Sequence, residues 1–253
     1  MEIIEIKSEV EVKNSKNNLN QILDKKIADE LPNTSGFCMV ILGSSDSGKT
    51  TLLYSLMNSV TKKGIKHGYK RVFNKIYVIS PTIGKKSIKN DPFTSLPENQ
   101  IFREVTMPIL LEIEEELKKN REEEIHSLLI LDDVGSQLKR SQAINLKLTS
   151  ILQNRRHLFT SCFALIQKFR DMPTGIRSNM SHFITFFIKN NKEEEAVVSE
   201  MFKFKSSDVK KIFDYVFQDK YDFLYIDMSL KKSAAYIFHR NFNRLELNFK
   251  NVL

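Results

Sequence analysis

The spacing of glycine, lysine and threonine in residues 43–50 is typical of a loop that binds phosphate groups. These residues read Gly-Ser-Ser-Asp-Ser-Gly-Lys-Thr, the G-x-x-x-x-G-K-[ST] pattern of the P-loop. An apolar run at 37–42 precedes the loop and an apolar helical pattern at 51–57 follows it, which argues against a chance match. Free N–H groups and the helix dipole at such a junction favour a bound polyanion. The residues predicted to bind a nucleotide are Gly43, Ser44, Ser45, Asp46, Ser47, Gly48, Lys49, Thr50 and Thr51.

Two side chains of this loop have predicted chemical roles. Lys49 would reach the β- and γ-phosphates, and the hydroxyl of Thr50 would bind Mg²⁺. The sequence therefore predicts ATP and Mg²⁺ as the cofactors.

A second segment has the composition needed to bind the metal and activate water. Four aliphatic residues, Leu128–Leu131, indicate a buried strand, and Asp132 and Asp133 follow it directly. At the carboxyl end of a parallel strand, Asp132 would hold Mg²⁺ through its water shell, and Asp133 would orient or deprotonate the attacking water. The alternative is an acidic strand end that caps a turn before Gly135.

Two further polar features flank the next predicted strand, 160–167. Gln167 ends this strand, where it could respond to the γ-phosphate or be an ordinary strand-end amide. Arg155 and Arg156 close the helix before it. Their positive charges could simply interact favourably with the dipole at the helix C-terminus. Alternatively, one of them could be an arginine finger supplied to the nucleotide of a neighbouring subunit.

Strand and helix patterns alternate along the chain and predict an α/β fold. Its sheet would be open and mainly parallel, with helices on both faces and a hairpin at its edge. Residues 1–34 are predicted to form an extension with a strand-like pattern near Ile4–Val12, and residues 35–253 the P-loop domain. The predicted strands are 37–42, 75–80, 101–105, 127–133, 160–167, 182–188, 223–227 and 234–238, and the predicted helices 51–57, 108–124, 141–157, 192–202 and 207–217.

Composition narrows the class of protein. The chain has 253 residues, 41% of them hydrophobic, and a formal net charge of +8. The excess of basic over acidic residues favours nucleic acid as a partner, although a solvated lysine-rich surface explains this excess equally well. No apolar run approaches the about 18 residues of a membrane span, and no secretory signal is expected. Cys38 and Cys162 lie in apolar runs and are predicted to be buried, reduced thiols.

Taken together, these motifs resemble the FtsK/HerA superfamily of DNA-pumping ATPases. The order is the P-loop, a hydrophobic strand ending in two acids, a helix ending in arginine and a strand ending in Gln167. With the segment 176–179, the chain looks most like the genome-packaging ATPases of large double-stranded DNA viruses, the poxvirus type, and of virophages. The resemblance covers roughly residues 35–190.

This resemblance implies a ring-forming motor that hydrolyses ATP and threads double-stranded DNA into a capsid. The ring would have five or six subunits, could contact a capsid vertex or portal protein, and would act in the virion or at the viral assembly site in the host cytoplasm. Lys49, Thr50 and Asp132 match the phosphate and metal ligands, and Gln167 matches the sensor. Asp133 matches the catalytic acid, often glutamate in the superfamily.

The resemblance also favours Arg156 over Arg155 as the trans-acting arginine, because Arg156 lies 11 residues before Gln167. DNA contacts would go mainly to phosphate. Their candidates are Lys139, Arg140, Lys168 and Arg170, for which solvated surface charge is the alternative. Other open readings are a P-loop kinase of small molecules or nucleotides, a non-packaging translocase or helicase-like ATPase, and a nucleotide-binding scaffold without turnover.

Overall fold

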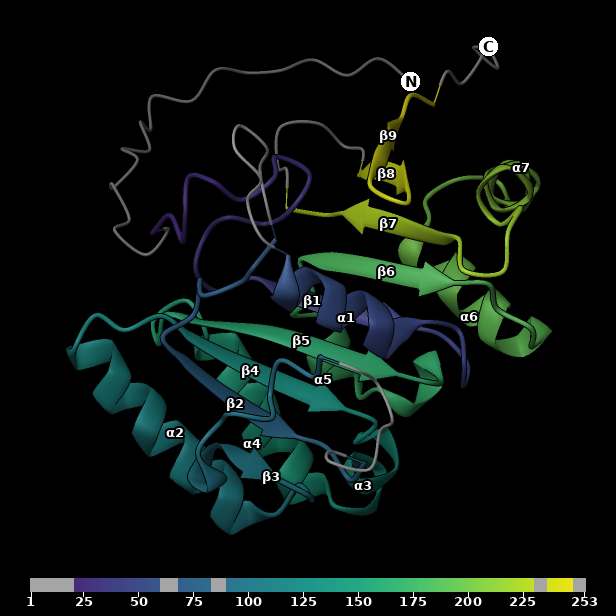
Figure 1. Ribbon diagram of the computed structural model, residues 1–253. Coiled ribbons are helices and arrows are strands. Elements are labelled where there is room, and N and C mark those ends of the chain that lie inside the picture. Colours follow the sequence, from purple (N-terminus) through teal and green to yellow (C-terminus); the bar gives the residue numbers. More distant parts are fainter. Residues whose placement is uncertain (1–20, 60–67, 83–89, 230–235, 248–253) are drawn as a thin grey trace, which may run out of the picture.

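A twisted nine-stranded sheet forms the centre of the computed structural model, which describes residues 21–59, 68–82, 90–229 and 236–247 (Figure 1). The strand order is β3-β2-β4-β5-β1-β6-β7-β8-β9, with parallel pairing from β3 to β6 and antiparallel pairing from β6 to β9. The strands are β1 (Cys38–Leu42), β2 (Lys75–Ile79), β3 (Ile101–Phe102), β4 (Ser127–Asp132), β5 (Thr160–Ile166), β6 (His182–Phe186), β7 (Phe223–Asp227), β8 (Ile237–Arg240) and β9 (Asn243–Leu245).

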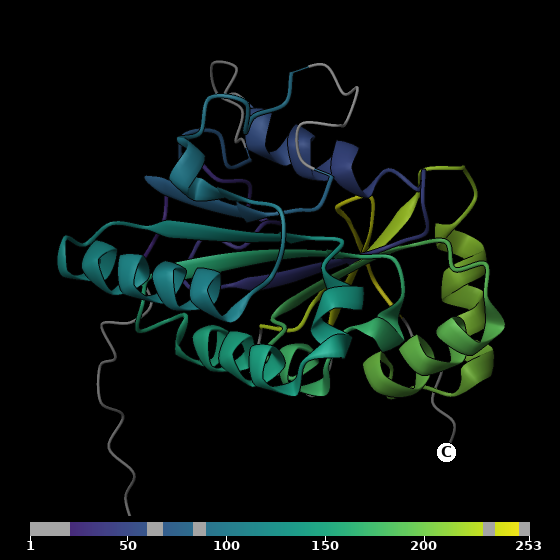
Figure 2. The same cartoon turned by 90° about the horizontal axis from the view of Figure 1, so that it is seen from below.

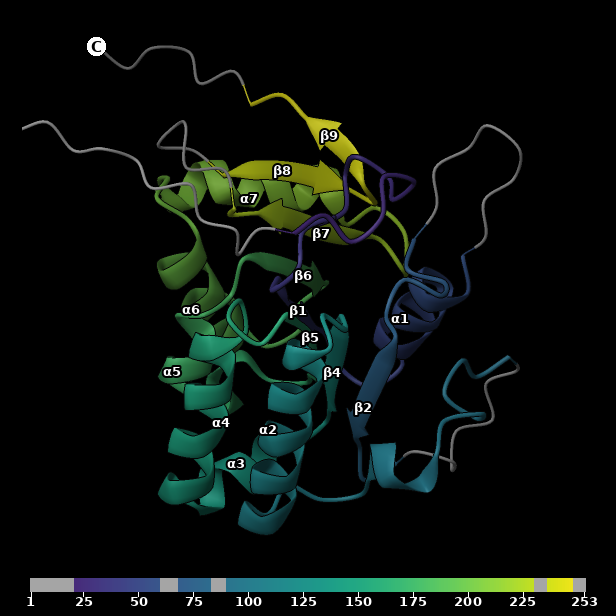
Figure 3. The same cartoon turned by 90° about the vertical axis from the view of Figure 1, so that its left-hand side faces the viewer.

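Helices cover both faces of the sheet, as the alternation of patterns predicted (Figures 2 and 3). α1 packs on one face, with the segment around Ile27 and the aromatic residues Tyr69 and Phe73. The apolar sides of α2, α4, α5, α6 and α7 pack on the other face. The helices are α1 (Lys49–Asn58), α2 (Met107–Glu122), α3 (Gly135–Arg140), α4 (Gln142–Asn154), α5 (Thr174–Arg177), α6 (Asn191–Met201) and α7 (Ser206–Val216).

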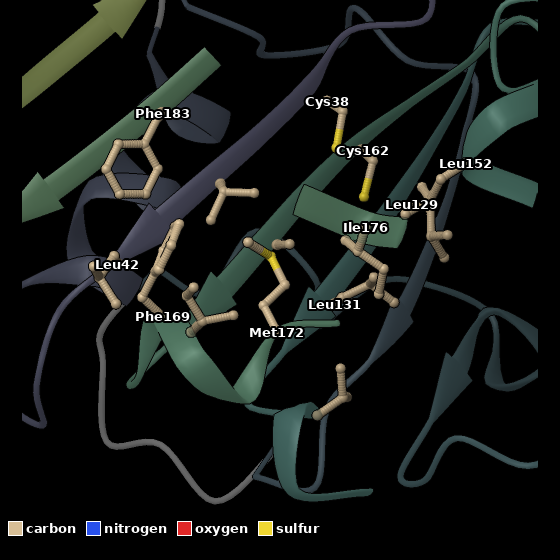
Figure 4. Packing of buried hydrophobic residues seen from close by; sticks show 14 of the residues in the cluster. Cys38, Leu42, Leu129, Leu131, Leu152, Cys162, Phe169, Met172, Ile176 and Phe183 are labelled. Atoms are coloured by element: carbon tan, nitrogen blue, oxygen red, sulfur yellow. The ribbon is translucent and has the colours of Figure 1, made fainter. Parts of the chain in front are cut away.

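Alternation along β1 divides its side chains between these two cores. Cys38, Val40 and Leu42 enter the core under α2 to α7, and Met39 and Ile41 enter the core under α1. All five are buried, which is why this strand reads as a continuous apolar run in the sequence. Cys38 pairs in register with Cys162 of β5, and both thiols are free and buried side by side (Figure 4). The prediction of buried, reduced cysteines is confirmed.

The observed elements differ from the predicted ones in several places. The predicted strand 101–105 is only Ile101–Phe102, and the short helix α5 was not predicted. The predicted helix 141–157 ends at Asn154, and a separate short helix, α3, precedes it. The side chain of Ser141 accepts a hydrogen bond from the N–H of Ile144 and so caps the N-terminus of α4. The predicted hairpin is present, but its second strand β8 lies at Ile237–Arg240, and β9 extends the sheet by one further strand.

The N-terminal segment is tied to the domain where the structure describes it. Ile22 bridges to Thr34, and Ile27 and Leu31 are buried in the core under α1. The strand predicted near Ile4–Val12 lies outside the described residues.

Candidate nucleotide-binding and catalytic site

The P-loop connects the carboxyl end of β1 to the first turn of α1, as its sequence predicts. The N–H of Gly43 donates to the carbonyl of Ile166 at 3.1 Å, which joins the start of the loop to the neighbouring strand β5. Lys49 Nζ donates to the carbonyls of Gly43 (2.6 Å) and Ser44 (2.8 Å), so its ammonium group lies within the loop. A Cβ at position 43 would lie 2.3 Å from Ser47 Oγ and would displace that hydroxyl, and Gly48 has a φ of +105°, which favours glycine.

Thr50 and Asp132 both border one small, mainly apolar cavity between α1, β2 and β4, and the two side chains would supply hard oxygen ligands to a bound metal. Asp132 is 8% exposed, and its Oδ2 accepts a hydrogen bond from Ser80 Oγ at 2.8 Å. The donor set of hydroxyl and carboxylate oxygens fits Mg²⁺, which also takes phosphate oxygens and water. Ser80 was missed in the sequence, although it is a polar residue directly after the parallel strand β2, the same signal that marked Gln167.

Asp133 and Gln167 meet beside the P-loop. β5 lies between β1 and β4, so Gln167 follows the strand that separates the P-loop strand from the strand carrying Asp132. Gln167 Nε2 donates to Asp133 Oδ2 at 2.7 Å. The backbone of Asp133 is left-handed, with a φ of 59°, and its N–H donates to the carbonyl of Leu165. This turn directs the carboxylate of Asp133 toward Gln167.

The two candidate arginines lie at the amino-terminal ends of the strands, because they precede β5, while the P-loop follows the carboxyl end of the neighbouring parallel strand β1. Arg155 is 7% exposed and is held within its own subunit. Its guanidinium donates to the carbonyls of Gly36 (2.8 Å) and Leu152 (2.8 Å) and to Asn179 Oδ1 (3.2 Å). Arg156 is exposed.

The four basic candidates for DNA contact fall into two groups. Lys139 and Arg140 are exposed at the end of α3, and Lys139 forms an ion pair with Asp171. Lys168 and Arg170 line a pocket of about 580 Å³ that begins at Gly43–Ser45 and includes Gln167. The second pair is therefore next to the expected site of the nucleotide phosphates.

A P-loop, a buried acid behind it and an acid–glutamine pair at the end of the neighbouring strands define a P-loop NTPase. Its fold is similar to that of two proteins of known structure. The DNA-packaging ATPase B204 of Sulfolobus turreted icosahedral virus superposes with a TM-score of 0.57, at 16% identity, over 81% of this chain and 97% of that one. The genome packaging NTPase B204 of Sulfolobus turreted icosahedral virus 2, in complex with ATP-gammaS, superposes with a TM-score of 0.54 at 14% identity, over 80% of this chain and 96% of that one.

The chain belongs to the poxvirus A32 protein family, which it matches over residues 26–238. It is 31% identical over 192 residues to the DNA packaging protein OPG160 of vaccinia virus, strain Copenhagen, covering 76% of this chain and 68% of that protein. It is 32% identical over 174 residues to OPG160 of variola virus, covering 68% and 61%. The resemblance to poxvirus-type packaging ATPases is confirmed. Among the described residues, no helix is long and apolar enough to cross a membrane.

Proposed function

We propose that this protein is an ATP-hydrolysing motor that translocates double-stranded DNA to package a viral genome into a capsid. The observation that carries the proposal is the hydrogen-bonded pair of Asp133 and Gln167 beside an intact P-loop, in a chain of the A32 family. The OPG160 relatives are named DNA packaging proteins, and the chain spans about two thirds of the vaccinia protein. The formal net charge of +8 suits a partner covered with phosphate.

The residues divide the chemistry between them. Lys49 and the loop N–H groups bind the phosphates, and Thr50 and Asp132 hold Mg²⁺. The ion, when bound, neutralises charge on the transferring phosphoryl group. Asp133 orients the attacking water or accepts its proton. Gln167, hydrogen-bonded to Asp133 at 2.7 Å, links the position of that acid to the phosphate pocket which Gln167 also lines.

Subunits of this motor assemble into a homo-oligomeric ring in which neighbours share active sites. Arg156 is exposed before the amino-terminal end of β5, and the P-loop follows the carboxyl end of β1, so Arg156 would not reach the nucleotide of its own subunit. In a head-to-tail ring, opposite sides of adjacent subunits face one another, and Arg156 would reach the neighbour's γ-phosphate. An arginine supplied in this way accelerates phosphoryl transfer by about 10³–10⁵-fold.

The motor would act in the virion or at the viral assembly site in the host cytoplasm. A capsid vertex or portal protein would hold the ring in place, and the exposed Lys139 and Arg140 are the better candidates for phosphate contacts with DNA. Lys168 and Arg170 lie in the nucleotide pocket instead.

Hydrolysis measured against metal and DNA tests the proposal. Purified protein should release phosphate from ATP only with Mg²⁺, and faster with duplex DNA, while Lys49→Ala should release none. Robust transfer of phosphate to a nucleoside or nucleotide acceptor would overturn the proposal in favour of a kinase. Equal, negligible turnover in wild type and Asp133→Asn would favour a nucleotide-binding scaffold.

A further inference from the structure

A tyrosine lies exposed directly beside the P-loop, although nothing in the sequence pattern marks it. Tyr221 is 56% exposed, in the loop between α7 and β7. Its ring carbon Cδ1 lies 3.4 Å from the position that a Cβ on Gly48 would occupy. Gly48 caps the N-terminus of α1, where the phosphates are expected. The ring therefore lies next to the N-terminus of α1, beside the expected position of the phosphates.

The loop that carries Tyr221 is fixed in position by a buried carboxylate. Asp222 accepts hydrogen bonds from the N–H groups of Gln218 (3.2 Å) and Asp219 (2.9 Å), and it forms an ion pair with Arg240 at 2.8 Å. Burial alone would raise the pKa of Asp222, but these contacts and the Asn241 amide lower the pKa to about 2. The charged carboxylate thus holds the loop in one arrangement before any ligand binds.

The same loop forms one wall of a cleft against the P-loop. This cleft, of about 520 Å³, lies between Ser44–Ser47 on one side and residues 217–220 on the other. Phe187, which is 54% exposed, extends the apolar wall, with its ring 5.9 Å from that of Phe217. Lys220 lines the cleft, and its Nζ lies 4.8 Å from the centre of the ring of the next residue, Tyr221. A flat apolar group that also has polar edges fits these surroundings.

We propose that Tyr221 binds the nucleobase of the ATP by stacking, beside Gly48 of the P-loop and next to this cleft. The proposal rests on the proposed function in so far as the P-loop binds a nucleoside triphosphate. An exposed aromatic ring on a preformed loop binds a base at little entropic cost, and such stacking contributes about 1–3 kcal/mol per base. Loss of the ring should therefore weaken ATP binding by roughly 10-fold or more.

The test compares two tyrosines of equal exposure. Tyr215, on α7, is also 56% exposed, but its ring lies against Arg240 and not beside Gly48, so Tyr215→Ala is the matched control. Calorimetric titration with ATP and with inorganic tripolyphosphate separates base from phosphate contacts. Tyr221→Ala should bind ATP roughly 10-fold more weakly and tripolyphosphate as wild type does. Tyr221→Phe and Tyr215→Ala should bind ATP within about twofold of wild type, since both keep the stacking ring.

Three results would overturn the assignment. In the first, Tyr221→Ala binds ATP as tightly as wild type does. In the second, Tyr221→Ala loses affinity for ATP and for tripolyphosphate equally, which would mean that the ring only supports the P-loop. In the third, only Phe187→Ala loses affinity for ATP, which would assign the nucleobase to Phe187. The titration uses neither DNA nor turnover. A motor that is indifferent to DNA would thus refute the proposed function without affecting this result, and a wild-type protein that binds no ATP would refute both.

Discussion

Two adjacent arginines, Arg155 and Arg156, should respond in different ways to alanine substitution. Arg155 is buried and donates three hydrogen bonds, to two backbone carbonyls and to Asn179. Arg155→Ala leaves these buried acceptors without their donor, and each unsatisfied acceptor costs about 1–3 kcal/mol. Because such terms are not fully additive, we expect the free energy of unfolding to fall by about 3–5 kcal/mol. Arg156 is exposed, and Arg156→Ala should change the free energy of unfolding by less than about 0.5 kcal/mol.

Urea unfolding followed by circular dichroism measures both changes, and ATP hydrolysis by the same samples separates folding from catalysis. Arg155→Lys is a useful second variant, because one ammonium cannot replace the forked guanidinium at three acceptors. A stable Arg155→Ala protein that fails only in hydrolysis would refute the reasoning and make Arg155 the finger.

The catalytic role of Arg156 is tested in rings that contain two different variant subunits. Arg156→Ala subunits have an intact P-loop, and Lys49→Ala subunits have an intact arginine. If the arginine acts in trans, mixing two inactive proteins should restore some complete sites and hence some hydrolysis. No recovery in mixed rings that are shown to assemble would count against trans action.

Three further predictions follow from the site and the core. Asp133→Asn should abolish hydrolysis and keep ATP binding, measured by phosphate release and calorimetry. Retained hydrolysis would mean that another residue is the general base. Ser80→Ala removes the hydrogen bond to Asp132 and should raise the Mg²⁺ concentration for half-maximal hydrolysis severalfold, with ATP affinity in excess Mg²⁺ unchanged. Burial lowers the pKa of His182 to about 4 against the opposing effect of Asp227. The unfolded chain therefore binds a proton that the folded protein excludes between pH 6.5 and 4, and stability falls as the pH falls. From pH 7 to 5 this histidine should cost about 2 kcal/mol in urea unfolding, and His182→Asn should flatten that dependence; an equal slope in both proteins would contradict it.

Features carried by local spacing could be predicted from the sequence. The P-loop, the acids at 132–133 and Gln167 follow directly from strand ends in a parallel sheet, because such ends meet at one edge. The two cores follow from the alternation along strands such as β1. The start of α4 was predicted to within one residue, but its end lies three residues earlier than predicted. The helix α3 was missed, because six residues carry too little periodicity to indicate a helix.

Features that depend on long-range contact could not be predicted. Tyr221 lies beside Gly48 only because β7 pairs with β6, which pairs with β1, and no periodicity records that arrangement. The different environments of Arg155 and Arg156 depend on how the last turn of a helix faces the start of β1. Ser80 belongs to neither case: its strand was predicted, but its partner Asp132 was not connected to it.

An ATP-driven DNA motor with active sites shared between subunits is tested most directly by measuring ATP hydrolysis and particle mass on the same samples. Light scattering and phosphate release would be recorded over a series of protein concentrations, with and without duplex DNA. We expect hydrolysis to rise with the fraction of assembled oligomer and to rise further with duplex DNA. Full hydrolysis by the monomer, unchanged by duplex DNA, would contradict the account.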